Sequence, residues 1–288
     1  MPAHRPLLAL LAAALVGGIA APAGAQPRAP RAGAPAARVI PLRDAVQMLH
    51  ASSADEVREG VAALTRLGTP EVVPPLVELV ESGVDDALLD YVVEQLGFVG
   101  RPEGIPALST LLHHRRPAVR RLAVASLKNV FQRSRDPRVP ALLESALRDS
   151  SGDVRGEAAT ALGEINARGS VALLQRAFDR NVPEASVSIG RLGDWAACQR
   201  LMESIGRMPL SVLIPGFEAF MARRDLTDDN RHTIIETLVS RSPTRPVKDF
   251  LQRWVQGLPP GDRSRARQRA SLAIRQIHDD APASGGAQ

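Results

Sequence analysis

Residues 153–163, which read DVRGEAATALG, and residues 171–178, VALLQRAF, decide the fold of this chain. In the first segment alanine and leucine recur three and four positions apart. In the second, apolar residues stand at the first, fourth, seventh and eighth positions. Both spacings place the apolar side chains on one face of a helix. The two segments predict a pair of amphipathic helices joined by a turn, the first of them rich in small residues.

The second-helix pattern returns along the chain, each time starting at a branched apolar residue. It is strict after Val73, Ile105 and Ile214, and looser after Val139 and Val171. The first four starts are separated by 32, 34 and 32 residues. A unit repeated at such a period predicts an all-α solenoid, an α-α superhelix whose neighbouring repeats bury one continuous core.

Glycine and proline mark the predicted helix boundaries. Gly68 and Gly100 follow apolar helical segments, as glycines that end helices do. A proline follows the first residue of most second-helix patterns, and proline is tolerated near a helix start but not inside a helix. Four prolines are therefore predicted to lie near the starts of second helices: Pro74, Pro106, Pro140 and Pro215.

The segment DVRGEAATALG, followed after a turn by a valine-led amphipathic run, resembles HEAT repeats, specifically the HEAT-like repeats of the phycobilisome-lyase type. The resemblance is close over residues 53–180 and loose over residues 181–280. It implies a superhelix of helix pairs in which the second helices line the concave face. Another α-solenoid, such as an armadillo array, is the alternative, but two helices per unit and the repeat length favour HEAT repeats.

The C-terminal third departs from the regular spacing. Val171 and Ile214 are 43 residues apart, more than one unit. We expect residues 183–192 to form a short extra or broken helix, residues 227–239 a first helix and residues 246–255 a second helix. Residues 264–277 match a first helix and are expected to be a lone, arginine-rich cap that closes the solenoid. The alternative is a basic face that contacts anionic lipid or another polyanion. The expected organisation is thus repeats over 41–180 and divergent helical repeats with a capping helix over 181–280.

The N-terminus is predicted to be an export signal. Residues 1–25 contain a short polar start, an apolar run and the small residues Ala23, Gly24 and Ala25, the features of a secretory signal peptide cleaved after Ala25. The mature protein would then be periplasmic or secreted, without a transmembrane span; an uncleaved membrane anchor is the alternative. Residues 26–40, rich in proline, alanine and arginine, are expected to be a disordered linker, and residues 281–288 a disordered tail.

The distribution of charge does not favour a nucleic-acid partner. The net charge is +5, but Arg5, Arg28, Arg31 and Arg38 precede the predicted repeats without any acidic residue, which leaves +1 for residues 39–288. A nucleic-acid-binding domain typically carries a marked excess of positive charge on one face.

No motif indicates catalysis, and we predict no enzyme activity, no metal and no cofactor. Adjacent helical residues point in different directions, so His113 and His114 are poorly placed to share a metal ion. The single cysteine, Cys198, is expected to pack between helices, with a free thiol or an intermolecular bridge as the alternative. Three arginines recur after valine near first-helix starts and are expected to be structural, pairing with helix-start acids such as Asp55 and Asp153, with ligand contact as the alternative: Arg58, Arg120 and Arg155.

The exposed positions of the second helices are the candidate partner-binding residues. They carry both signs of charge, which suits a protein or peptide partner better than nucleic acid. The sequence therefore predicts an exported, non-enzymatic scaffold. A membrane-tethered structural or regulatory protein is an alternative, as is an enzyme like the bilin lyases and isomerases suggested by the resemblance. The candidate residues, expected together on the concave face, are Glu78, Glu81, Thr110, His113, Glu144, Arg176, Asp179 and Glu218.

Overall fold

The computed structural model describes residues 40–278; residues 1–39 and 279–288, which hold the expected signal peptide, nearly all of the linker and the tail, lie outside this range. Within the described residues the chain forms fifteen α-helices and no strand, which confirms the all-α prediction. The helices are α1 (Leu42–Met48), α2 (Ala54–Leu67), α3 (Val73–Glu81), α4 (Asp86–Val99), α5 (Ile105–Leu111), α6 (Pro117–Ser134), α7 (Arg138–Ala146), α8 (Gly152–Glu164), α9 (Val171–Asp179), α10 (Ala185–Leu192), α11 (Trp195–Glu203), α12 (Leu210–Met221), α13 (Asp228–Arg241), α14 (Arg245–Gln256) and α15 (Arg265–Gln276).

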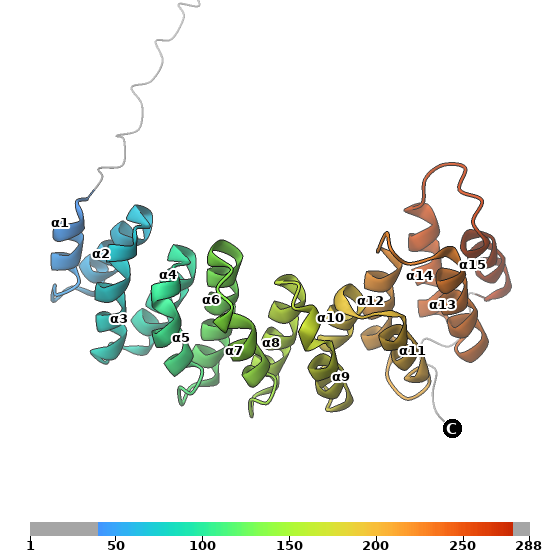
Figure 1. Cartoon of the computed structure of the whole chain (residues 1–288), viewed down its shortest axis with the longest axis horizontal. Coiled ribbons are helices and arrows are strands. Elements are labelled where there is room, and N and C mark those ends of the chain that lie inside the picture. Colours follow the sequence, from blue (N-terminus) through green and yellow to red (C-terminus); the bar gives the residue numbers. More distant parts are fainter. Residues whose placement is uncertain (1–39, 279–288) are drawn as a thin grey trace, which may run out of the picture. The chain divides into compact units, whose positions relative to one another are not determined.

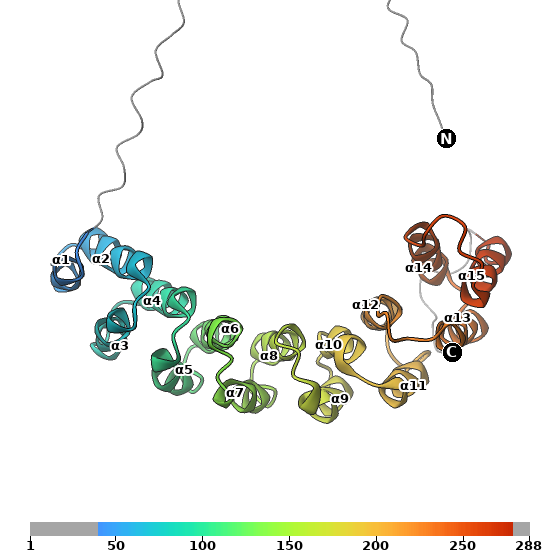
Figure 2. The same cartoon turned by 45° about the horizontal axis from the view of Figure 1, so that its top comes forward.

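The helices alternate between two layers, as Figures 1 and 2 show. The first layer contains α2, α4, α6, α8, α10, α12 and α14, each packed against the next. The second layer contains α3, α5, α7, α9, α11 and α13. Helices α3, α5 and α9 begin at the predicted anchors Val73, Ile105 and Val171, and α7 begins one residue before Val139. The repeat period read from the sequence is therefore the period of the helix pairs.

Small residues allow the helices of the first layer to approach closely. Gly97 on α4 faces Ser126 on α6, and a Cβ atom at Gly97 would stand 2.8 Å from the Ser126 Cα atom. The Ser126 hydroxyl donates a buried hydrogen bond of 2.8 Å to the Val93 carbonyl oxygen on α4, so the one polar group in this contact is satisfied. The alanine-rich faces seen in the sequence are thus the contacts between neighbouring repeats.

The second layer is packed less closely along its row. Consecutive second-layer helices from α3 to α9 contact one another much less than consecutive first-layer helices do. The glycine, alanine and serine contacts between neighbouring repeats therefore lie in the first layer, and the expectation that second helices line the concave face stays a prediction.

The C-terminal helices occupy different positions from those predicted. Residues 183–192 were expected to form a short extra or broken helix; α10 is short, with eight residues, but it is unbroken and packs as a first-layer helix between α8 and α12. Helix α12 begins at Leu210, so Pro215 lies inside the helix and not at its start. A Cβ atom at Gly190 on α10 would stand 2.3 Å from the carbonyl oxygen of Gly216 on α12, and this close crossing fixes α12 in the first layer.

Because α10 takes a place in the first layer, each of the helices α12 to α14 lies in the opposite layer from the one predicted. Helix α13 packs against α11 and α15, in the second layer, and α14 packs against α12, in the first. The order predicted for residues 227–255, a first helix followed by a second helix, is therefore reversed. Helix α15 is not a lone first helix, because it contacts both α13 and α14. Its residues Ala266, Ala270, Ala273 and Ile277 are buried, and Ile274 is partly buried.

The arginines of α15 are only partly directed outward. The Arg265 guanidinium forms an ion pair of 3.1 Å with Asp229 on α13, and Arg269 forms one with Glu236 on the same helix. The Arg269 pair holds the pKa of Glu236 below its ordinary value, chiefly through the hydrogen bond between the two side chains. Much of the basic face therefore joins α15 to α13, as expected of the last pair in a stack.

Candidate partner-binding surfaces

The predicted partner-binding residues are divided between the two layers. Seven belong to second-layer helices or to the turn after α5: Glu78, Glu81, Thr110, His113, Glu144, Arg176 and Asp179. Glu218 lies on α12, in the first layer. The expectation of a single surface is wrong at Glu218, because α10 completes a pair with α11 and places the following helix in the other layer.

Two of the seven second-layer residues meet at a small hollow between α7 and α9. Glu144 and Arg176 both line this space of about 90 Å³. The Glu144 carboxylate also accepts a hydrogen bond of 2.6 Å from the Ser170 hydroxyl, so part of its hydrogen-bonding capacity is used inside the fold. Glu78, Glu81 and Asp179 are exposed and make no hydrogen bond with other described side chains.

A large hollow space of the described structure lies between α12 and α14, in the first layer. Two adjoining hollows of about 700 and 650 Å³ follow the two helices. We call them together the α12–α14 groove. Ile214 and Pro215 are among the residues of the first hollow, and Phe250 and Trp254 are among those of the second. Ile214 and Phe250 are buried behind these hollows, whereas Pro215 and Trp254 are only partly buried and remain accessible from the groove.

A charged bridge crosses this groove where the two hollows meet. Glu218 on α12 and Arg253 on α14 line both hollows and form an ion pair of 2.8 Å. Their side chains are 43% and 59% exposed. An ion pair this open to water contributes at most about 1 kcal/mol, so either charge can exchange its partner at little cost. The groove thus has apolar residues in its lining and one carboxylate and one guanidinium group, those of Glu218 and Arg253, that can bind another partner.

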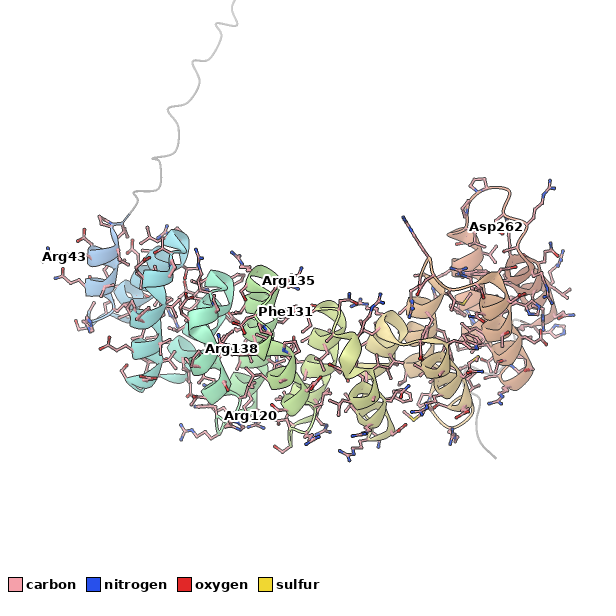
Figure 3. All side chains as sticks on the ribbon, in the orientation of Figure 1. Arg43, Arg120, Phe131, Arg135, Arg138 and Asp262 are labelled. Carbon is pink, nitrogen blue, oxygen red and sulfur yellow. The ribbon has the colours of Figure 1, made fainter. Side chains whose placement is uncertain are left out.

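The second hollow has a rigid rim, because Arg231 on α13 is held by backbone carbonyl groups. Its guanidinium donates to the carbonyl oxygens of Leu226 at 2.6 Å, Met221 at 3.3 Å and Arg223. Asp262 closes the same hollow, and hydrogen bonds from Ser264 hold the pKa of its carboxyl below the ordinary value. Figure 3 shows Asp262 on the loop between α14 and α15. No sequence motif indicated this groove, because its residues come from segments about 40 positions apart.

Two of the three recurrent arginines, Arg120 and Arg155, have structural contacts, though not with the expected acids. Arg120 on α6 binds both carboxylate oxygens of Asp149 at 2.7 Å, across the turn before α8. The Arg155 guanidinium donates to the carbonyl oxygens of Asp149 at 2.8 Å and Ser150 at 3.0 Å. The predicted pairing with Asp55 and Asp153 is wrong, because each arginine folds back onto the turn preceding its own repeat or the next. Arg58 is exposed.

The groups considered for chemistry are separate from one another. Within residues 40–278, no three histidine, cysteine, aspartate or glutamate side chains lie close enough to hold a metal ion. Cys198 is fully buried in α11, as predicted, and burial raises the pKa of its thiol to about 12. His114 accepts a hydrogen bond of 3.2 Å from the Arg116 backbone, while His113 is exposed. Across the same range, no helix is long and apolar enough to span a bilayer.

Comparisons with known proteins agree with the repeat architecture. The family description "HEAT repeats" matches residues 42–128 and 84–152, and "PBS lyase HEAT-like repeat" matches residues 154–180. No curated protein matches the chain.

Two solved structures illustrate the structural likeness. The complex of CpcE and CpcF of phycocyanin lyase from Nostoc sp. PCC7120 is 15% identical over 88% of this chain and 100% of that chain, with a TM-score of 0.46. The karyopherin Kap121p, bound to the extreme C-terminus of the protein phosphatase Cdc14p, is 12% identical over 81% of this chain and 29% of that chain, with a TM-score of 0.50. At these identities the likeness concerns the fold alone. From the repeated helix pairs and the family matches, the chain is a HEAT-repeat protein.

Proposed function

We propose that this protein is an exported, non-enzymatic scaffold that binds an extended segment of a protein partner in the α12–α14 groove. The observation that carries the proposal is the pair of adjoining hollows of about 700 and 650 Å³, with apolar walls and the exposed Glu218–Arg253 pair between them. An extended peptide presents side chains alternately on its two sides. It can therefore place apolar groups in both hollows and polar groups beside the charged pair.

The charge pattern of the groove favours a peptide over a polyanion. Glu218 and Asp249 balance Arg207 and Arg253 in the first hollow. A strand of nucleic acid would meet the two carboxylates as well as the two guanidinium groups, and like charges facing each other weaken association. The solved karyopherin holds a protein C-terminus on a solenoid of the same fold, but the proposal for this chain rests on its own groove. Export rests on the signal-like composition of residues 1–25.

Site-specific photocrosslinking in the intact cell envelope tests this assignment. A photoreactive amino acid is placed at position 253 in the groove and, separately, at position 78 on α3 as a control of similar exposure. We expect a crosslinked partner from position 253, and we expect Trp254→Ala to abolish it. Trp254 is only partly buried, so its loss should leave the fold intact.

Two results would contradict the proposal. A crosslink from position 78 but not from position 253 would assign binding to the second-layer residues first suggested by the sequence. A crosslink from position 253 that persists in the Trp254→Ala variant would show contact without occupation of the groove.

A further inference from the structure

A second hollow lies at the opposite end of the described repeats, where α2, α4 and α6 end side by side. It has a volume of about 680 Å³. Its polar lining consists of the three arginines Arg66, Arg101 and Arg133 with the hydroxyl groups of Thr65 and Ser134, and Phe98 supplies an aromatic side. We call this the arginine pocket. Figure 3 locates this end of α6 by the labelled Phe131 and Arg135, with Arg120 at the other end of the helix.

The three arginines come from three successive repeats and are held in place by the fold. Arg101 donates to the carbonyl oxygen of Gly68 through Nε at 3.0 Å and Nη2 at 2.8 Å, which covers the end of α2. Arg66 donates through Nε to the Ala62 carbonyl oxygen at 3.2 Å. Cations at helix C-termini are favoured by the partial negative charge of the last carbonyl groups. Each of these two guanidinium groups keeps further N–H donors that form no hydrogen bond with described residues.

Arg133 reaches the pocket across a glycine. A Cβ atom at Gly100 would stand 2.2 Å from the Arg133 Cδ atom, so no larger residue leaves room for this side chain. Gly100 also has a φ of 65°, in the left-handed region that favours glycine. The Arg133 guanidinium forms neither a hydrogen bond nor an ion pair with any residue in the range 40–278.

The pocket has positive charge without a matching carboxylate. No acidic residue lines it, and none of its three arginines forms an ion pair within the described residues. Some arginines elsewhere are paired with carboxylates, such as Arg116 with Asp90 at 2.9 Å and Arg120 with Asp149 at 2.7 Å. Glu71, which does not line the pocket, is an acidic residue that interacts electrostatically with Arg101. Hydrogen bonds, first with Thr69, lower the pKa of Glu71, and Arg101 adds a smaller electrostatic contribution. Three guanidinium groups without counter-charges form a site for an anion.

The aromatic side of the pocket indicates what kind of anion fits. Phe98 is 54% exposed, the highest exposure among the large apolar side chains of the described range. Guanidinium groups bind carboxylates in a planar, two-pronged geometry, and an exposed phenyl ring gains from contact with an apolar side chain. We propose that the arginine pocket binds an acidic peptide segment, with carboxylates on the arginines and an apolar side chain on Phe98.

This site is independent of the α12–α14 groove, because the two share no residue. It can hold a second segment of the same partner or a different acidic protein. Linking two such contacts raises the overall affinity beyond that of either site alone. Substitutions in one site leave the lining of the other unchanged, so the two proposals are tested separately.

The test is fluorescence anisotropy with the purified full-length chain and three labelled peptides: EEDFLEE, its amide counterpart QQNFLQQ, and EEDGSEE, which lacks the apolar pair. EEDFLEE should bind, with an affinity that falls as salt is added. QQNFLQQ should bind at least about tenfold more weakly, because the charge-assisted hydrogen bonds are lost. EEDGSEE should lie between them. Inorganic phosphate and a short oligothymidylate are added as competitors.

Two variants and a control connect binding to the pocket. Arg133→Glu should weaken EEDFLEE binding by at least about tenfold. Phe98→Ser should weaken EEDFLEE but not EEDGSEE. Arg263→Glu makes the same charge change at an exposed arginine outside the pocket and should alter the affinity by no more than about twofold, because salt screens distant charges.

The inference fails if EEDFLEE does not bind, or if QQNFLQQ binds as tightly as EEDFLEE. It also fails if Arg133→Glu and Arg263→Glu weaken EEDFLEE binding equally. A further contradicting result is stronger competition by phosphate or oligothymidylate than by unlabelled EEDFLEE. The last result would replace the peptide by a phosphate-bearing ligand. Thermal unfolding of each variant, unchanged from that of the parent chain, shows that lost binding does not reflect lost folding.

Discussion

Ser188 on α10 lies against Gly163 on α8, so closely that a Cβ atom at Gly163 would stand 2.3 Å from the Ser188 hydroxyl oxygen. That hydroxyl donates a buried hydrogen bond of 2.7 Å to the carbonyl oxygen of Ala159, one turn earlier on α8. The same arrangement joins Gly97, Ser126 and Val93 at the contact of α4 with α6. A glycine on one helix and a serine on the next thus connect two pairs of first-layer helices.

Replacing Gly163 by alanine should separate α8 from α10. The added methyl group has no space, and overpacking of this kind costs about 1–3 kcal/mol in the free energy of unfolding. Gly169→Ala is the matched control, because a Cβ atom there meets nothing within 4 Å. Thermal and urea unfolding measure the difference. Equal stability of the two variants would show that the α8–α10 contact adjusts freely.

The Arg120–Asp149 pair should make stability depend on pH. The side chains are only 11% and 10% exposed, and the hydrogen bond with Arg120 lowers the pKa of Asp149. Because the folded-state pKa is lowered, the stabilisation is complete above the pKa of an unfolded aspartate and is lost as the pH falls through the folded-state value. Arg120→Ala should cost about 1–3 kcal/mol at neutral pH.

Unfolding of the parent chain and Arg120→Ala, followed from neutral to strongly acidic pH, checks this assignment. The gap between the two melting temperatures should narrow at acidic pH. A constant gap across the whole range would mean that Arg120 stabilises the turn by packing and not through the Asp149 carboxylate.

Cys198 should be unreactive in the folded protein. Thiolate is the reactive form of cysteine, and a thiol whose pKa is raised to about 12 is almost entirely protonated at pH 8. A thiol reagent should label the chain only after urea unfolds it. The measurement is labelling at pH 8 with and without urea, and rapid labelling of the folded chain would show that α11 opens readily.

Charge exchange in the α12–α14 groove should separate binding from stability. Glu218→Arg places two positive charges together but, since both positions are open to water, should change the free energy of unfolding by less than about 1 kcal/mol. Partner crosslinking, read out from position 249 of the groove so that Arg253 is kept, requires the original negative charge at position 218 and should decrease. The double exchange Glu218→Arg with Arg253→Glu restores the internal pair with reversed polarity. Recovery of crosslinking from position 249 in that double variant would mean that the partner does not recognise the direction of the charges.

Export predicts a defined N-terminus for the mature protein. N-terminal sequencing of chain purified from the producing cells should begin at Gln26, after the small residues that end at Ala25. A chain that begins at Met1 and sediments with membranes would support the tethered alternative.

The sequence by itself determined the helices and their period. Apolar residues at helical spacing, with glycines after the segments, placed the starts of α3 and α5 and the ends of α2 and α4. These features could be read because a helix is stabilised by neighbours within one or two turns of the chain. The burial of Cys198 followed from the same local pattern.

Only the tertiary structure decided which helix packs against which. Helix α10 packs between α8 and α12, and this packing places α12 and Glu218 in the first layer, which no local pattern reveals. The Arg120–Asp149 pair joins residues 29 positions apart. The arginine pocket likewise brings together one arginine from each of three repeats, and none of the three lies in a motif that indicates a binding site. The physical reason is that the spacing of residues within one helix determines its apolar face. Grooves and clusters of unpaired charges instead depend on how closely helices from different repeats approach.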